Sequence, residues 1–295
     1  MAKGNKSVVK RGQVIKAVGG RFIVKSAGKL YKAHARGKIR LSQEIYVGDY
    51  VEFVEDRPFA IIESVEPRKT VLTRPYVANV DTAIIVVAKE PVPDLLLVDK
   101  VIINCFAEGI KPYLCYNKSD LASAEDIEKV FVQYKDIVEC FAISSLNGNG
   151  MEVFEPIIND RTVTLAGQSA VGKSSLLNKL LGLDLETGEL SEKILRGKNT
   201  TRHIEIMEAF GGQVLDTCGF SMLELMNIES RELRLYYDDF CKLQHECAYR
   251  GCEHINEPNC AIKKAVEEGT INKARYERYK TIYTELKENE KKKYE

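Results

Sequence analysis

Residues 167–174 read G-Q-S-A-V-G-K-S, which is the G-x-x-x-x-G-K-S pattern of a phosphate-binding loop. An apolar run at 163–165 precedes the pattern and residues that favour a helix follow it, which is the strand–loop–helix context that such a loop requires. Earlier in the chain, residues 117–120 read N-K-S-D, the N-K-x-D pattern of a guanine-binding loop. In an ordinary GTP-binding protein the phosphate loop comes first. The reversed order therefore predicts a circularly permuted α/β nucleotide-binding fold.

The sequence around these motifs alternates between apolar runs and stretches with helical periodicity. The run at 83–87 is apolar throughout, as expected of a strand that is buried on both faces. We expect strands at 83–87, 113–116, 137–143, 163–165, 203–208 and 212–216, and helices at 94–107, 124–134, 150–158 and after Lys173. Such alternation predicts a parallel sheet with helices on both faces.

The chain from Arg11 to about Val65 consists of short apolar runs separated by glycine turns. About five short strands in such a segment predict a small β-barrel, which we interpret as an OB-fold. The sequence alone leaves an SH3-like barrel open. Residues 1–9 are expected to form a basic arm that precedes the barrel.

The formal net charge of zero conceals a strong asymmetry. Residues 1–40 contain twelve lysines and arginines and no acid, and the first acidic residue is Glu44. A local positive field of this kind suits a polyanion, and nucleic acid is the most plausible partner. Charge alone does not separate RNA from DNA.

Composition and cysteine spacing limit the cellular compartments in which the protein could fold. Apolar residues make up 44% of the chain, but no run of about 18 apolar residues could span a membrane, and the basic N-terminus lacks the apolar stretch of a signal peptide. Cys105, Cys115 and Cys140 lie singly in apolar segments, whereas other cysteines cluster near a histidine. We therefore expect a reduced, cytoplasmic protein.

The phosphate loop assigns roles to its residues. Gly167 and Gly172 allow backbone angles that point successive N–H groups at phosphates. Lys173 is expected to neutralise the β- and γ-phosphates, and the Ser174 hydroxyl to bind Mg²⁺.

The guanine loop supplies the base contacts. Asp120 can accept two hydrogen bonds from guanine, which adenine cannot offer. Asn117 and Lys118 are expected to brace this loop and cover the base, and Ser144-Ser145 fits a second base-contacting loop. The residues expected to contact GTP or GDP are Asn117, Lys118, Ser119, Asp120, Ser144, Ser145, Gly167, Gln168, Ser169, Ala170, Val171, Gly172, Lys173, Ser174 and Ser175.

Residues 216–219 read D-T-C-G and match the D-x-x-G pattern of a nucleotide switch. Asp216 is expected to hold Mg²⁺ through water, and the Gly219 N–H to contact the γ-phosphate. Thr200 and Thr201 are both candidates for the switch threonine, and our Mg²⁺ set is Ser174, Thr201 and Asp216.

The residue after this switch motif is Phe220, where many GTPases carry a glutamine that orients the attacking water. Phenylalanine can neither donate nor accept a hydrogen bond. We therefore expect slow intrinsic hydrolysis and a partner that supplies the missing polar group.

Cys247, Cys252, His254 and Cys260 offer three thiolates and one imidazole within fourteen residues. Such a set suits tetrahedral Zn²⁺, and a complete protein shell indicates a structural site. His245 is a competing ligand at this point. After about residue 225 the chain has helical periodicity, and the apolar stripe at 272–289 is expected to pack into a core.

Taken together, these residues resemble one family, the bacterial ribosome small subunit-dependent GTPases (RsgA, also called YjeQ). The resemblance covers nearly the whole chain. It implies three domains, namely an OB-fold-like RNA-binding barrel at 1–70, a circularly permuted G domain at 71–224 and a mainly helical zinc-binding domain at 225–295. It also implies a late-acting assembly factor of the small (30S) ribosomal subunit that binds ribosomal RNA, acts as a monomer and hydrolyses GTP when the subunit stimulates it.

The chain departs from the family pattern at two positions. Cys218 stands where the family usually has proline, and Asn199 where it usually has a histidine that could position water. Asparagine can bind a water but cannot act as a base at neutral pH, and His203 is a possible substitute. Our expected catalytic group is Lys173, Asn199, Thr201 and Gly219.

Other functions stay open at this stage. A GTP-gated RNA-binding switch and a GTPase of large-subunit assembly are the alternatives. An enzyme that uses the zinc for catalysis is least favoured, because the four ligands leave no open coordination position.

Overall fold

The computed structural model describes residues 8–37, 39, 43–56, 58–73, 76–182, 204–216, 225 and 228–292. Two compact units are present. The first consists of Met1–Ala83, Met151–Ala166 and Gly172–Phe220, and the second of Ile84–Gly150, Gly167–Val171 and Ser221–Glu295. Each unit combines segments that are distant in the sequence. The three expected domains stay a prediction.

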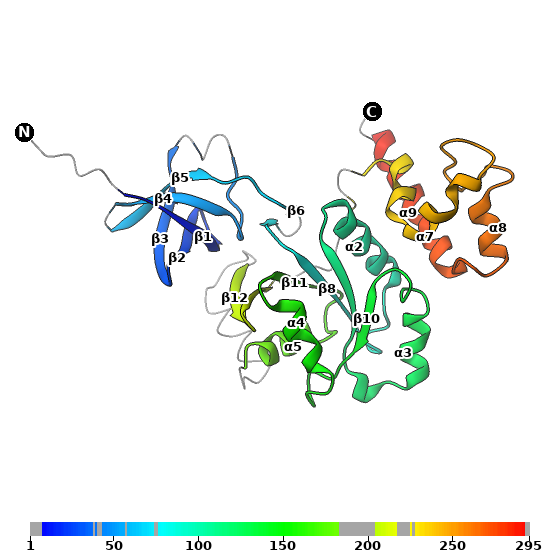
Figure 1. Ribbon diagram of the computed structural model, residues 1–295, viewed down its shortest axis with the longest axis horizontal. Coiled ribbons are helices and arrows are strands. Elements are labelled where there is room, and N and C mark those ends of the chain that lie inside the picture. Colours follow the sequence, from blue (N-terminus) through cyan, green and yellow to red (C-terminus); the bar gives the residue numbers. More distant parts are fainter. Residues whose placement is uncertain are drawn as a thin grey trace, which may run out of the picture. The chain divides into compact units, whose positions relative to one another are not determined.

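A closed five-stranded barrel begins the first unit (Figure 1). Its strands are β1 (Val9–Val18), β2 (Arg21–Ser26), β3 (Lys29–Ala35), β4 (Tyr50–Asp56) and β5 (Phe59–Val65). They follow the order β1-β2-β3-β5-β4, and β1 pairs again with β4 to close the barrel. The β3–β5 pairing is parallel and the others are antiparallel. This arrangement is the Greek-key barrel of the OB-fold, so the OB-fold prediction is confirmed and the SH3-like alternative is not.

The barrel interior is formed by alternate residues of each strand, with Val14, Val24, Val51, Phe53 and Ile62 fully buried. Strand β1 packs tightly against its neighbours at Gly12, where a larger residue would not fit. A Cβ atom at Gly12 would lie 2.5 Å from Val24 Cγ1 and 2.8 Å from the Lys25 carbonyl oxygen.

The rest of the first unit contains the remaining strands and the helix of the phosphate loop. They are β6 (Val71–Thr73), β7 (Tyr76–Ala78), η2 (Met151–Val153), α4 (Phe154–Ile158), β11 (Thr162–Ala166), α5 (Lys173–Leu180), β12 (Glu205–Ala209) and β13 (Gly212–Asp216). Strand β13 pairs in parallel with β11 and antiparallel with β12. Strand β12 in turn pairs with the barrel strand β1, where Lys16 is opposite Glu205.

The antiparallel β12–β13 pair corrects the expectation of a parallel sheet at this position. The two strands are joined by a tight turn at Phe210-Gly211, and both residues have positive φ angles, 48° and 73°. A turn of this length returns the chain antiparallel to itself, whereas a parallel crossover needs a dozen or more residues.

The second unit contains a parallel part of the sheet. Its strands β8 (Thr82–Val87), β9 (Lys111–Tyr116) and β10 (Glu139–Ala142) are neighbours in the order β10-β9-β8, and β9 and β10 are parallel. Strand β8 is buried along its whole length, as the continuous apolar run predicts. Helices α2 (Leu95–Ala107) and α3 (Ala124–Phe131) begin at Asp94 and Ser123, whose side chains accept hydrogen bonds from backbone N–H groups of the first turn.

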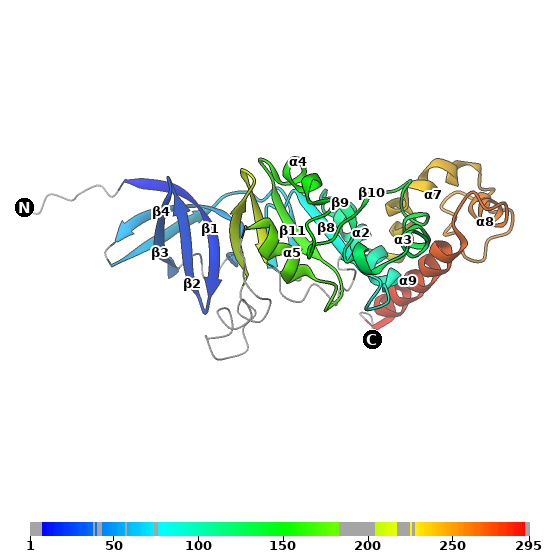
Figure 2. The same ribbon diagram turned by 90° about the horizontal axis from the view of Figure 1, so that it is seen from below.

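The C-terminal part of the second unit is helical (Figures 1 and 2). It comprises η3 (Ser230–Tyr236), α7 (Asp238–Leu243), η4 (Gln244–Glu246), α8 (Ala261–Glu267) and α9 (Lys273–Lys292). Tyr279, Ile282 and Leu286 of α9 are buried in its core with Phe240 and Ile262. The apolar stripe predicted at 272–289 is therefore core packing. Among the described helices, none is both long enough and apolar enough to cross a membrane.

Candidate functional site

The phosphate loop approaches strand β8 closely at its first residue. Gly167 has a φ angle of +129°, and a Cβ atom there would lie 2.2 Å from the Val86 carbonyl oxygen. Only glycine fits this position. Ala170 also has a left-handed backbone, with a φ angle of 65°. Such turns direct consecutive N–H groups to one side of the chain, where they can surround a phosphate.

The loop ends at helix α5, which begins at Lys173 and includes Ser174 and Ser175. Gly172 is its N-cap, with a φ angle of 94° and no side chain that could accept from the first N–H groups. Acidic residues are absent from the first turn. The positive end of the helix is therefore suited to an anion.

The guanine loop is attached to the phosphate loop through Asn117, which is fully buried. Its Nδ2 donates to the Val171 carbonyl oxygen at 3.0 Å, and its Oδ1 accepts from the Ser145 N–H at 3.1 Å. The backbone N–H of Asn117 donates to the carbonyl oxygen of Val87 at 2.8 Å. Asn117, at the end of β9, thus bonds to the end of β8, to the phosphate loop and to the loop of Ser144 and Ser145.

Lys118 adds two further hydrogen bonds between these loops. Its Nζ donates to the Ala170 carbonyl oxygen at 2.8 Å and to the Glu90 carbonyl oxygen at 2.9 Å. Asp120 is exposed, and its carboxylate forms no hydrogen bond or ion pair with any residue that the structure describes. It therefore has both oxygens available for the two N–H groups of a guanine edge.

The second base-contacting loop is ordered by its own residues. Ser144 is fully buried, and its Oγ accepts from the Asn147 N–H at 3.1 Å. The Ser119 N–H donates to the Ile143 carbonyl oxygen at 3.0 Å. The second unit therefore brings together residues 117–120, 144–145 and 167–171, although their contact with nucleotide stays a prediction.

The predicted switch residues lie outside the described part of the chain. These are Asn199, Thr200, Thr201, His203, Thr217, Cys218, Gly219 and Phe220. Asp216 ends strand β13, but its side chain is also not described.

Sequence reasoning missed a segment that contacts the phosphate loop. The side chain of Gln168 accepts from the Asp94 N–H at 2.9 Å and donates to the Val92 carbonyl oxygen at 3.2 Å. The sequence E-P-V-P-D at 90–94 indicates an extended loop before a helix N-cap, but nothing in it specifies the partner.

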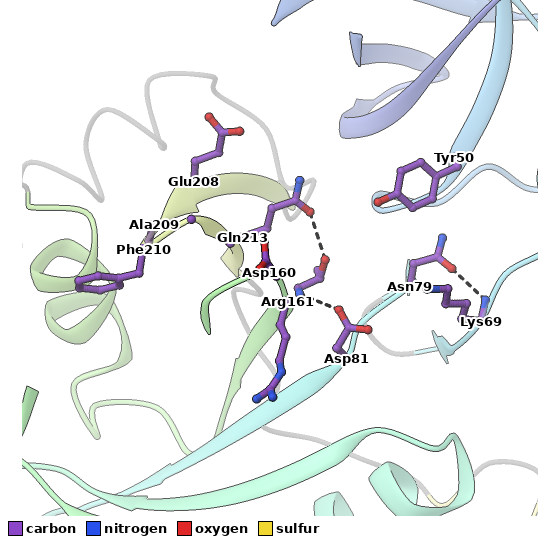
Figure 3. Close-up of a pocket in the computed structure, with 13 residues that line it drawn as sticks. Tyr50, Lys69, Asn79, Asp81, Asp160, Arg161, Glu208, Ala209, Phe210 and Gln213 are labelled. Atoms are coloured by element: carbon purple, nitrogen blue, oxygen red, sulfur yellow. Dashed lines mark hydrogen bonds between the residues drawn. The ribbon is translucent and has the colours of Figure 1, made fainter. Parts of the chain in front are cut away.

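A cavity of about 670 Å³ lies in the first unit (Figure 3). Tyr50 of the barrel, the segment around Lys69 and Asp81, and the β12–β13 hairpin line it. Two hydrogen bonds at its wall join Thr162 to Asp81 and Gln213, at 2.8 and 3.1 Å. Its described lining includes no residue that we expect to contact GTP.

The four predicted zinc ligands come together in the helical part of the second unit. The ligand atoms of Cys247, Cys252, His254 and Cys260 all lie within 4.8 Å of one another. The His254 Nδ1 is 3.6 Å from the Cys247 Sγ and 3.3 Å from the Cys260 Sγ, and these two sulfurs are 3.9 Å apart. Four ligands at zinc bonding distance in a tetrahedron are about 3.3–3.8 Å apart, so the separations among Cys247, His254 and Cys260 fit the ion.

The surrounding residues hold this cluster in place. The hydroxyl groups of Tyr276 and Tyr279 donate to the carbonyl oxygens of His254 and Glu253, at 2.7 and 2.6 Å. Burial lowers the pKa of His254 to about 4, so its imidazole is neutral at physiological pH, as a metal ligand must be. The competing candidate His245 is exposed and does not belong to the cluster.

The fold and the sites define a class of protein. The order of the guanine and phosphate loops, the N-terminal barrel and the cysteine–histidine cluster are those of a circularly permuted P-loop GTPase with accessory domains. The RsgA GTPase family model matches residues 65–226, and the RsgA N-terminal domain model matches residues 11–58. The chain belongs to the RsgA GTPase family, as its motifs predict.

Relatives and solved structures agree over almost the whole chain. The small ribosomal subunit biogenesis GTPase RsgA of Caldanaerobacter subterraneus subsp. tengcongensis is 40% identical over 291 residues, which cover 96% of this chain and 98% of that protein. The relative named RsgA 1 of Listeria monocytogenes serotype 4b is 42% identical over 283 residues, covering 94% and 97%.

YjeQ from Thermotoga maritima has a similar structure, with a TM-score of 0.80, 35% identity and coverage of 95% and 99%. YloQ, described as a circularly permuted GTPase, has a TM-score of 0.77, 30% identity and coverage of 98% and 99%.

Proposed function

We propose that this chain hydrolyses GTP in the biogenesis of the small ribosomal subunit. The observation that carries the proposal is the Asn117 side chain, which joins the guanine loop to the phosphate loop. The order of these loops agrees with the description of YloQ as a circularly permuted GTPase. Two relatives named as GTPases of small-subunit biogenesis cover 94–96% of the chain.

The residues divide the chemical work as follows. Asp120 reads the guanine edge, and the N–H groups of residues 167–173 with the Lys173 ammonium compensate the phosphate charge. Ser174 and Thr201 would hold Mg²⁺, Asp216 would hold it through water, and the ion would compensate the charge of the phosphates. Because Phe220 cannot orient a water, the rate of hydrolysis stays low until the ribosomal subunit supplies or induces a group that can.

The cysteine–histidine cluster binds one structural Zn²⁺ in this proposal. Three thiolates and a neutral imidazole complete a tetrahedral shell, which leaves no open position for catalysis. The ion replaces a larger apolar core in the short helical part of the chain.

The barrel provides an RNA-contacting face in this proposal. Arg21 is opposite His34 and Ile23 is opposite Lys32 in the β2–β3 pair, so the side chains of these residues share the outer face. The rings of His34 and Phe59 meet edge to face with 4.7 Å between centroids, and Phe59 is 42% exposed. Arg21 and Lys32 are exposed and form no ion pair with a described residue.

Exposed aromatic rings beside free cations are typical of surfaces that bind single-stranded nucleic acid. Stacked bases contribute about 1–3 kcal/mol each, and the cations attract the phosphates. This face therefore fits a single-stranded segment of ribosomal RNA. A soluble, monomeric, cytoplasmic protein fits the same role.

Turnover of GTP tests the proposal when it is measured with small subunits, with large subunits and with neither. We expect slow turnover alone and strong stimulation by small subunits only. Stimulation by large subunits alone would reject the assignment, and binding without any stimulation would favour a GTP-gated RNA-binding switch.

The affinity for small subunits tests the RNA-contacting face of the barrel. The double variant Arg21→Glu/Lys32→Glu should bind small subunits about tenfold or more weakly, whereas Lys129→Glu on the exposed face of α3 should bind them as the wild type does.

A further inference from the structure

A single arginine of the C-terminal helix joins three segments of the second unit. The guanidinium of Arg278, on α9, donates from Nε to Asp99 on α2, from Nη1 to Gln133 at 3.0 Å and from Nη2 to the hydroxyl of Tyr134 at 3.1 Å. The Arg278 side chain is 14% exposed and that of Asp99 is 2% exposed. A buried charge pair of this kind is costly to break, because either partner alone would be left uncompensated.

Tyr134 extends this contact to the beginning of helix α2. Its ring is fully buried, and its hydroxyl donates to the carbonyl oxygen of Leu95 at 3.1 Å. The same hydroxyl oxygen accepts from Arg278, so both partners orient it. Leu95 is the first residue of α2, directly after the N-cap Asp94.

The segment before α2 is bonded to the phosphate loop. The Asp94 N–H donates to the side chain of Gln168, which donates in turn to the Val92 carbonyl oxygen, at 2.9 and 3.2 Å. Lys118 connects the same segment to the loop again, through Glu90 and Ala170. Residues 90–95 are therefore held at Glu90 by Lys118, at Val92 and Asp94 by Gln168 of the phosphate loop, and at Leu95 by Tyr134.

We propose that Arg278 is a positioning residue for the nucleotide site, acting through Tyr134 and residues 90–95 on the phosphate loop. This inference rests on the GTP binding proposed above. Arg278 fixes the Tyr134 hydroxyl, Tyr134 fixes the start of α2, and the adjoining segment supplies the backbone groups to which Gln168 and Lys118 are bonded. Without the arginine, the loop gains freedom that nucleotide binding must remove, and affinity falls.

Thermodynamic linkage makes the relation reciprocal. If Arg278 favours the nucleotide-binding arrangement of the loop, bound nucleotide favours the attachment of α9 by the same factor. The zinc-bearing part of the chain would then respond to nucleotide through its long helix, without a ligand contact of its own.

The dissociation rate of a fluorescent GDP analogue from the full-length, zinc-loaded protein tests this role. Tyr134→Phe removes only the hydroxyl and leaves the buried ring. Arg278→Lys keeps a positive charge for Asp99, but its donors are on a single nitrogen and lack the fork of the guanidinium that reaches Gln133 and Tyr134. We expect each variant to release GDP about 3–10-fold faster, the size expected for the loss of a buried hydrogen bond. Lys100→Gln is the matched control, because Lys100 pairs with Glu285 between the same two helices but does not contact Tyr134. It should release GDP at the wild-type rate.

A double-mutant cycle separates positioning from a loss of stability. In a Gln168→Ala background, Tyr134→Phe should have a clearly smaller further effect on GDP release, because one of the two links to the loop is already cut and only the Lys118 link remains. Fully additive effects of the two substitutions would overturn this inference and leave the proposed function intact. The same holds if Tyr134→Phe and Arg278→Lys proteins that retain zinc release GDP at the wild-type rate. A wild-type protein that fails to bind GDP or GTP would reject the proposed function and this inference together.

Discussion

The nucleotide loops and the metal cluster are built in opposite ways. Residues 117, 144–145 and 167–171 come from three separate segments, yet their own side chains and backbone already hold them together through Asn117 and Lys118. The metal ligands come from fourteen consecutive residues, and their thiol and imidazole groups face one another with no side chain between them. The first site is assembled by contacts between distant segments, whereas the second brings together groups that we propose a Zn²⁺ ion joins.

Removal of the metal should therefore have the largest effect. Three thiolates within 4.8 Å of one another repel unless a cation lies among them, and structural zinc contributes on the order of 10 kcal/mol or more. We expect chelation, or Cys252→Ser, to unfold the helical region 228–292, as measured by helical circular dichroism and protease sensitivity. Cys241→Ser, outside the cluster, should retain one zinc per chain and full helicity. A chelated protein that keeps its helices would contradict the proposed difference between the two sites, namely that only the cysteine–histidine cluster depends on an ion.

Gly167→Ala should have the next largest effect, because it breaks the long-range assembly at its tightest point. The new methyl group would lie 2.2 Å from the Val86 carbonyl oxygen, so the phosphate loop must move away from β8. We expect GTP affinity to fall by more than about 100-fold, measured by calorimetry, because the loop loses the geometry that its N–H groups need. Gly109→Ala is the matched control, since it has a φ angle of +69° and open space around it. It should cost only about 1–2 kcal/mol of stability and leave GTP binding intact.

Asn117→Ala should have an intermediate effect. It leaves the Val171 carbonyl and the Ser145 N–H without their partner in a buried site, at a cost of about 1–3 kcal/mol each. Affinity for GTP and GDP should therefore decrease by about 10–100-fold. Asn147→Ala is the control on the Ser144–Ser145 loop, because Asn147 bonds to a described residue through its backbone N–H and not through its side chain. Equal affinity losses in the two variants would show that the bridging contacts of Asn117 are unimportant.

The smallest effect is expected from the local contacts of helix α3. Hydrogen bonds from Lys89 and Ser123 hold the pKa of Asp126 below its ordinary value of 3.8. The lowered pKa means that this stabilisation is present above about pH 4 and is lost as the pH falls below it. Amide hydrogen exchange in α3 should accelerate in that range, and Asp126→Asn should remove much of the pH dependence. Because the partners of Asp126 lie in or next to α3, exchange elsewhere in the second unit should not follow.

The sequence predicted what local patterns can encode. The glycine-separated runs of the barrel, the fully apolar strand at 83–87, the helical stripe at 272–289 and the spacing of Cys247, Cys252, His254 and Cys260 each appear in the structure as predicted. These features depend on residues within one short segment, where periodicity or spacing determines the outcome.

Contacts between distant segments were not predictable in this way. Nothing near Gln168 specifies the backbone of residues 92–94 as its partner, and nothing in α9 identifies Arg278, rather than Arg275, as the residue that contacts α2. Arg275 pairs with Asp239 inside the helical part instead. The strand near 203–208 was predicted, but its antiparallel pairing with β13 was not, because the alternation of strands and helices along the chain gave no sign of a hairpin.

The pairing of β1 with β12 has a consequence for the order in which the chain acquires its structure. Within the first unit, Gln13 and Gln213 exchange two amide hydrogen bonds at 3.1 and 2.7 Å, and Lys16 reaches Glu205 across 189 residues of sequence. The barrel strands β1 to β5 are complete within the first 65 residues. During synthesis the barrel can therefore fold as soon as it leaves the ribosome, while the part of β1 around Lys16, beyond its pairing with β4 at residues 9–13, gains its β12 partner much later. A nascent chain of this kind carries a finished domain and an unpaired strand edge at the same time.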